Sequence, residues 1–162
     1  EALAGMDDVV VKMHTDSGLL TALADGTTLA DAAAQVLDYV RTHVPEPRKA
    51  PLAGSSVHVD RAYLARDMPA FTEHLHYRIV DVSSIKELVR RWYPRAYFAS
   101  PNKRGGHRAL ADILDSINEL RYYREAVFVP APGPNSEDAK AITDALDSER
   151  DRSEQPVDSV TD

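Results

Sequence analysis

The chain has 162 residues, of which 43% are hydrophobic and 28% charged, with 10 Pro, 7 Gly and no Cys. This length suits one domain with an appendage, and this hydrophobic share is typical of a globular protein. The absence of Cys excludes disulfides, zinc–thiolate sites and thiol nucleophiles. No apolar run is long enough to span a membrane, and the first residues lack the basic-then-apolar order of a secretory signal. We therefore expect a cytoplasmic protein without a membrane partner.

The net charge of −7 is unevenly distributed along the chain. Residues 131–162 hold nine acidic and three basic residues and thus carry −6. The rest is close to neutral, so the acidic total does not exclude an anionic ligand. We divide the chain into a domain over 1–130 and an acidic, disordered tail over 131–162, with at most a weak helix over 137–146.

Apolar periodicity and capping residues predict several helices in chain order. A first helix over 3–13 is followed by a stop at Gly18, and Thr28 is expected to cap a second helix that runs to Val44. Ser84 and Glu87 have the spacing of a capping box, which predicts a helix from Ser84 to Trp92. Further helices are expected over 57–66, 69–75 and from His107 to about Val127, whereas 93–106 is expected to be irregular.

Two short segments have the composition of buried strands, namely residues 51–54 and the β-branched run over 77–82. Strands that alternate with helices indicate an α/β fold. Two strands are few, because most sheets contain four to six. We therefore expect that part of the sheet is missing from these 162 residues.

Asp60 follows the first predicted strand within a few residues, and ligands of open α/β sheets bind beyond the carboxyl ends of strands. A carboxylate there is a candidate ligand of Mg²⁺, which prefers oxygen. The alternative is a surface ion pair between Asp60 and Arg61 or Arg66.

His107 follows two glycines at the start of the long helix, five residues before Asp112. Five helical residues turn by about 500°, so the two side chains are no i,i+4 ligand pair. One interpretation places both at a common site, with His107 in the glycine hinge. The alternative is a solvated acidic face formed by Asp112, Asp115 and Glu119.

Basic and hydroxyl residues flank the second strand at Tyr77-Arg78 and Ser83-Ser84. Arginine and helix N-termini both suit phosphate, although Ser84 as a cap and Arg78 in an ion pair are the structural alternative. The run Arg90-Arg91-Trp92 has the charge and the aromatic ring to bind nucleic acid. A partly buried Trp92 beside solvated arginines is the alternative that we favour.

Three segments together carry a family resemblance: PLAGSSVHVDRAYLARDMP (51–69), HYRIVDVSSIKELVRRWYP (76–94) and HRALADILDSINELRYYREAVF (107–128). With MHTDSGL (13–19), they resemble oligoribonucleases, 3′-to-5′ exoribonucleases of the DEDDh type, over about residues 1–130. The resemblance implies a ribonuclease H-like fold and a homodimer. It also implies hydrolysis of short oligoribonucleotides, especially dinucleotides, to nucleoside 5′-monophosphates, with two Mg²⁺ or Mn²⁺ ions as cofactors.

Site residues follow from the resemblance position by position. Asp60 and Asp112 match metal-binding carboxylates, and His107 matches the general base. In the family a cap over the 5′ phosphate favours short substrates. The matching residues are Ser56, Arg78 and Ser83, with Tyr77 from the partner subunit, whereas His14 reaches the nucleotide from the first helix.

Two departures from the family pattern bear on function. The family's first motif, Asp-x-Glu on the first strand, has no counterpart in the 162 residues, and we expect it upstream with the first strands of the sheet. Ser55 stands where the family has Asn, so the supporting contact of that Asn need not be kept, whereas Ser56 itself is kept. Two alternatives stay open: an inactive dimerisation or nucleotide-binding fragment, and a DEDDh proofreading exonuclease that acts on DNA.

Overall fold

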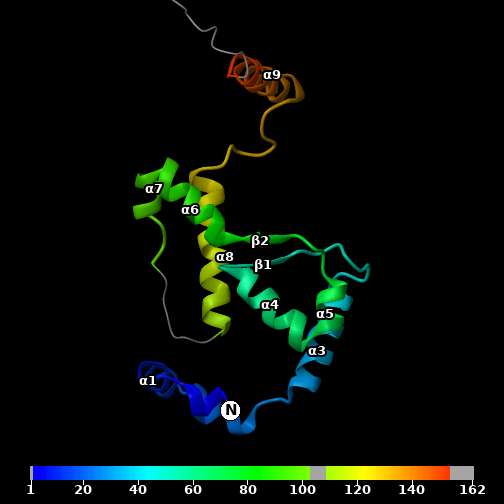
Figure 1. Cartoon of the computed structure of the whole chain (residues 1–162), viewed down its shortest axis with the longest axis vertical. Coiled ribbons are helices and arrows are strands. Elements are labelled where there is room, and N and C mark those ends of the chain that lie inside the picture. The colour runs from blue at the N-terminus through cyan, green and yellow to red at the C-terminus, as the bar shows by residue number, and fades with distance from the viewer. Residues whose placement is uncertain (1, 103–108, 154–162) are drawn as a thin grey trace, which may run out of the picture. The chain divides into compact units, whose positions relative to one another are not determined.

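The computed structural model describes residues 2–102 and 109–153. The chain divides into two compact units, Glu1–Val127 and Phe128–Asp162. The strands are β1 (Leu52–Gly54) and β2 (Ile79–Asp81) (Figure 1). The helices are η1 (Ala2–Gly5), α1 (Asp8–Asp16), α2 (Leu19–Ala22), η2 (Leu23–Asp25), α3 (Leu29–His43), α4 (Val57–Asp67), α5 (Pro69–His74), α6 (Val82–Trp92), α7 (Pro94–Phe98), α8 (Ala109–Ala126) and α9 (Ser136–Ser153).

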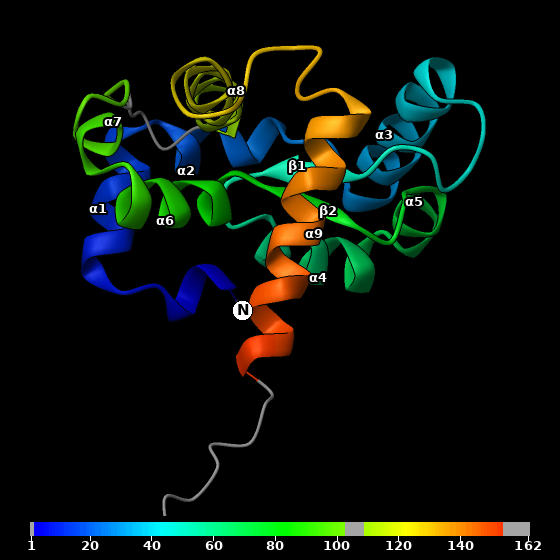
Figure 2. The same cartoon turned by 90° about the horizontal axis from the view of Figure 1, so that it is seen from above.

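The two strands form a parallel pair in which Leu52 lies opposite Ile79 and Gly54 lies opposite Asp81. Parallel strands need a crossover connection, which α4 and α5 supply here. Both α4 and α8 contact β1, and Figure 2 shows the strands among these helices. The α/β class is confirmed, and the described part of the chain contains only these two strands, as predicted.

Local sequence explains where the N-terminal helices begin. The Thr28 hydroxyl accepts a hydrogen bond from the Asp31 backbone N–H at 3.2 Å, so the predicted cap of α3 is confirmed. The first helix was expected over 3–13, which is wrong in its bounds. Asp7 has extended backbone angles (φ −65°, ψ 150°), and this break separates η1 from α1.

Two expectations around α6 are wrong. The helix begins at Val82 rather than Ser84, because the Asp81 side chain accepts from the Ser83 backbone N–H and takes the capping role. The segment after Trp92 was expected to be irregular, but α7 occupies Pro94–Phe98. Proline is well suited to the first helical turn, since its missing N–H has no partner there anyway.

The buried side chains form two groups. Val82, Val89 and Tyr123 join α6 to α8 in one cluster, and Val57 and Phe71 are buried on α4 and α5. The apolar side chains in the first half of α8 are largely exposed: Leu110, Ile113 and Ile117. No helix in the described ranges is long and apolar enough to cross a bilayer.

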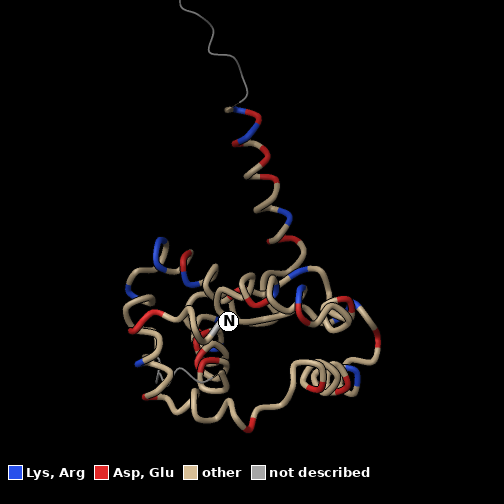
Figure 3. Tube along the Cα trace, turned by 60° about the horizontal axis from the view of Figure 1, so that its bottom comes forward, with Lys and Arg blue, Asp and Glu red and all other residues tan. Residues whose placement is uncertain are grey.

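The second unit contains α9, whose described residues are all exposed. The helix over 136–153 is longer than the predicted 137–146. The Asn135 side-chain oxygen accepts from the backbone N–H groups of Glu137 and Asp138, both at 2.9 Å, which caps the helix. Acidic and basic residues mix along it (Figure 3), and Arg150 pairs with Asp147 one turn away.

Candidate active site at the carboxyl edge of the strand pair

Both strands end at the same edge, because they run parallel. Ser55 and Ser56 follow β1, and β2 ends at Asp81 with Ser83 two residues later. This edge is where open α/β sheets bind ligands. Ser56 and Ser83, which lie 27 residues apart in the sequence, are therefore brought together at this edge.

Ser56 and Ser83 make direct contact, since their hydroxyl oxygens lie 3.2 Å apart. Each serine lies at a helix N-terminus, Ser56 before α4 and Ser83 in the first turn of α6. Helix N-termini carry partial positive charge, which favours anions. The serine pair thus has the donors and the field that a phosphate group needs.

Asp81 organises this serine pair and was missed by the sequence analysis. Its Oδ1 accepts from the backbone N–H of Ser56 at 2.9 Å and of Ser83 at 3.0 Å, and its Oδ2 accepts from the Ser84 hydroxyl at 3.0 Å. The signal that could have revealed it is the strong N-cap preference of Asp, here at the last residue of a strand and directly before a helix.

Asp60 and Asp112 line a common cavity of about 410 Å³ at the end of β1. Asp60 comes from the first turn of α4 and Asp112 from the first turn of α8. Both carboxylates are exposed, and both benefit from the positive end of their helix. The structure therefore gathers the two predicted metal ligands from segments 52 residues apart in the sequence.

Ser55 braces this cavity despite the change from the family's Asn. Its hydroxyl lies 2.9 Å from the Ser116 hydroxyl, and Ser116 also donates to the backbone carbonyl of Asp112 at 2.9 Å. The pair ties the end of β1 to α8. In this chain, the side chain at position 55 therefore makes its contact to Ser116.

The donor set of the cavity fits a hard divalent cation. Mg²⁺ takes oxygen ligands, keeps several waters and is commonly held by one or two protein carboxylates. Asp60 and Asp112 supply such oxygens in a cavity with room for water. No three His, Asp or Glu side chains within residues 2–102 and 109–153 cluster as a complete metal site, so the cavity alone offers a partial ligand set.

Tyr77 and Arg78 lie exposed at the start of β2. The Arg78 guanidinium carbon lies 5.4 Å from the centre of the Tyr77 ring, which in turn stacks on His76 at 4.5 Å between ring centres. Both side chains are thus open to a ligand. The alternative of Arg78 in a surface ion pair has no contact to support it among the described residues.

Two histidines were predicted to belong to the site, His14 and His107, and the structure describes only His14. His14 lies in the last turn of α1, a helix that packs on α2, and within the described part of the chain its buried Nδ1 has no hydrogen-bond partner. The structure does not place His14 in the Asp60–Asp112 cavity. His107 lies outside the described residues.

Several alternatives from the sequence fare differently in the structure. Arg66 pairs with Asp67 at 2.7 Å, and Arg61 donates to the His76 carbonyl. The predicted alternative of an ion pair between Asp60 and one of these arginines is therefore not seen among the described residues. Glu119 is buried, so the solvated acidic face is wrong for this residue. Trp92 is 65% exposed rather than partly buried, whereas the arginines before it pair with Glu87.

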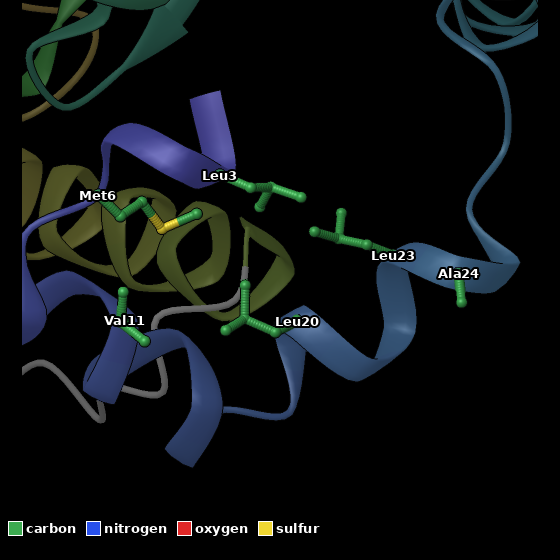
Figure 4. Close-up of a pocket in the computed structure, with 6 residues that line it drawn as sticks. All are labelled: Leu3, Met6, Val11, Leu20, Leu23 and Ala24. Carbon is green, nitrogen blue, oxygen red and sulfur yellow. The ribbon is translucent and has the colours of Figure 1, made fainter. Parts of the chain in front are cut away.

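A second cavity, of about 500 Å³, lies among the N-terminal helices and has a different character. Figure 4 shows its lining, in which Leu3 and Leu23 point toward one another and Met6 lies beside them. All its lining residues are apolar: Leu3, Met6, Val11, Leu20, Leu23 and Ala24. It has no group for acid–base or metal chemistry, so the Asp60–Asp112 cavity is the candidate active site.

The chain is similar to known exonucleases over most of its length. The profile of the RNase_T exonuclease family matches residues 1–120. An oligoribonuclease from Streptomyces avermitilis is 71% identical over 87% of this chain and 70% of its own length. Oligoribonucleases from Rhodococcus jostii and Mycobacterium avium are 57% and 55% identical, over 90% and 93% of this chain and 74% and 70% of their own lengths.

Proposed function

The chain belongs to the RNase_T exonuclease family, and from this premise we propose that it hydrolyses short oligoribonucleotides, above all dinucleotides, from the 3′ end to nucleoside 5′-monophosphates. As a 3′-to-5′ exoribonuclease it needs carboxylates at the scissile phosphate. The observation that carries the proposal is that Asp60 and Asp112 line a single cavity beside the Ser56–Ser83 pair.

Asp60 and Asp112 are the residues that would hold a divalent cation, Mg²⁺ or Mn²⁺, in this proposal. When bound, such ions stabilise charge on the attacking and leaving oxygens of a phosphodiester. His107 is proposed as the general base that accepts the proton of the attacking water. Imidazole suits this task, because its ordinary pKa lies near neutrality.

Ser56, Ser83 and Arg78 are proposed to bind the 5′ phosphate of the substrate. The serine hydroxyls lie side by side at two helix N-termini, and Arg78 is exposed at the start of the adjacent strand. Ser56, Ser83 and Arg78 together form what we call the phosphate grip, at a fixed distance from the two carboxylates. Such a grip would select short substrates, because a longer chain would collide with these residues before its scissile phosphate reached the carboxylates. His14 is proposed to contact the nucleotide from α1.

We further propose that the protein works as a cytoplasmic homodimer in which Tyr77 of the partner subunit completes the phosphate grip. The support is that Tyr77 is 69% exposed beside Arg78 in a single subunit, so its ring is available to a second copy.

The deciding experiment is done on protein that includes the Asp-x-Glu motif, because the described residues alone offer a partial ligand set. It replaces the two carboxylates by amides, as Asp60→Asn and Asp112→Asn, and follows hydrolysis of a diribonucleotide against Mg²⁺ concentration. Each variant should lose about 10²-fold or more in kcat, because cation binding contributes several kcal/mol to transition-state stabilisation. Asp38→Asn, an exposed carboxylate on α3, is the matched control and should leave kcat unchanged. Wild-type turnover in both variants would refute the proposal. Dinucleotide binding without any hydrolysis by the wild-type protein would favour a nucleotide-binding module instead.

A further inference from the structure

The Asp81 carboxylate links the two serines of the proposed phosphate grip. It accepts three hydrogen bonds at 2.9–3.0 Å, two from backbone N–H groups and one from a hydroxyl. Hydrogen bonds to an ionised acceptor are about twice as strong as neutral ones. Asp81 is therefore a firm anchor for the groups around it.

The two backbone donors belong to different helices. One is the N–H of Ser56 at the start of α4, and the other is the N–H of Ser83 in the first turn of α6. Both reach the same oxygen, Oδ1. This single atom fixes the distance between two helix N-termini that are far apart in the sequence, and with it the 3.2 Å separation of the two serine hydroxyls.

Ser56 needs such an anchor, because its backbone is left-handed (φ 54°, ψ 33°). A residue with a Cβ adopts this region at a cost, and surrounding contacts must hold it there. The hydrogen bond from its N–H to Asp81 is a contact of this kind. Without it, Ser56 would be free to return to a commoner conformation, which would turn its hydroxyl away from Ser83.

This arrangement allows the Ser56 and Ser83 hydroxyls to donate together to one phosphate group. Two hydroxyls 3.2 Å apart share one proton, which leaves the other proton to donate to a third group. A phosphate has several acceptor oxygens, so both hydroxyls can turn outward and donate to it together. The Asp81 carboxylate does not compete, since its bonds go to the two backbone N–H groups and to Ser84.

We propose that Asp81 is a positioning residue that sets the preference for 5′-phosphorylated dinucleotides by holding the Ser56 and Ser83 hydroxyls side by side. It acts through the serines and does not touch the substrate. The inference rests on the proposed function and adds to it the residue that makes the phosphate grip selective.

The test compares one dinucleotide with and without its 5′ phosphate, by KM and kcat and also by dissociation constants from calorimetry. Asp81→Ala should reduce the preference for the phosphorylated form about tenfold in KM and in Kd, the effect of one charged hydrogen bond. Asp81→Asn keeps an acceptor for the two N–H groups and should reduce it only about threefold. For both variants, kcat should stay near the wild-type value.

A double-mutant cycle shows whether Asp81 acts through the serines. In a protein that already carries Ser56→Ala and Ser83→Ala, Asp81→Asn should change the phosphate preference no further. An equal loss on both dinucleotides would make Asp81 merely structural and overturn the inference, as would an unchanged preference in Asp81→Asn and Asp81→Ala. If the wild-type protein hydrolyses neither dinucleotide, the proposed function fails, while the Kd ratio still decides the role of Asp81.

Discussion

Lys86 donates a hydrogen bond from Nζ to Oε1 of Glu119 at 2.8 Å, and this ion pair joins α6 to α8. The Glu119 side chain is only 6% exposed, whereas that of Lys86 is 32% exposed. The Tyr123 hydroxyl donates to the same oxygen at 3.1 Å. A buried carboxylate with these partners is tolerated only while they remain, because an unpaired buried charge is costly.

Lys86→Met should therefore lower the free energy of unfolding by about 3 kcal/mol, since it removes a cation that is hydrogen-bonded to the buried Glu119 carboxylate. Urea unfolding measures this difference. Lys12→Met is the matched control, because Lys12 forms an exposed pair with Asp16 at the same distance of 2.8 Å and should contribute little. Equal effects of the two substitutions would contradict the assigned role of burial.

The same cluster predicts a dependence of stability on alkaline pH. Burial, together with the charge of Glu119, raises the pKa of Tyr123 to about 12 from its ordinary value of 10.0. The unfolded chain therefore loses this proton at lower pH than the folded protein. The contribution of Tyr123 is complete below pH 10 and should be lost as the pH rises toward 12. The difference in unfolding free energy between wild type and Tyr123→Phe should show this slope, and a flat difference over that range would contradict it.

His107→Ala should lower kcat for dinucleotide hydrolysis by about 10²-fold or more and leave KM nearly unchanged, because a general base acts in the transition state. Steady-state kinetics at neutral pH measures both constants. His43→Ala, at the exposed end of α3, is a matched control. A kcat near the wild-type value in His107→Ala would make this histidine a bystander.

Arg78→Ala should weaken turnover of a 5′-phosphorylated dinucleotide more than that of the unphosphorylated one. A lost charged hydrogen bond to phosphate costs roughly 1.5–3 kcal/mol, or about 10- to 100-fold in kcat/KM. Arg41→Ala, an exposed arginine on α3, controls for the loss of general positive charge. Equal losses on both substrates would show that Arg78 has a structural role.

Removal of the chain after Pro134 should leave the fold and dinucleotide hydrolysis intact. The truncation removes α9, which has no buried residue in its described span and is capped by its own Asn135. Thermal unfolding and kinetics provide the measurements. A fall of about ten degrees in Tm, well above what a surface segment contributes, would mean that Ile142 and Leu146 pack on another surface.

The sequence predicted elements well where a local signal decides them. Thr28 before an apolar periodic run is a cap that needs no tertiary information, and the structure has it. Ser84 with Glu87 offered an equally good local signal, yet Asp81 caps the helix instead. Its carboxylate also satisfies Ser56, and this contact across 25 residues is invisible to any local pattern.

The candidate site was predictable to a similar extent. Asp60 could be named because it follows a strand end, and Asp112 could be named from the family resemblance; the structure brings both to one cavity. The serine brace of Ser55 and Ser116 could not be predicted, because it depends on how closely α8 approaches β1.

The parallel pairing of β1 and β2 has a consequence for the order in which the protein is made. A ribosome delivers Asp60 and the start of α4 first, but the partner strand that pairs with Leu52–Gly54 arrives only with residues 79–81. Asp112 and Ser116 emerge later still. A parallel pair closes only after its whole crossover is available, so the nascent chain holds isolated helices before it holds a site. Assembly of the carboxylate cavity is thus a late event of synthesis, which follows emergence of α8 from the exit tunnel.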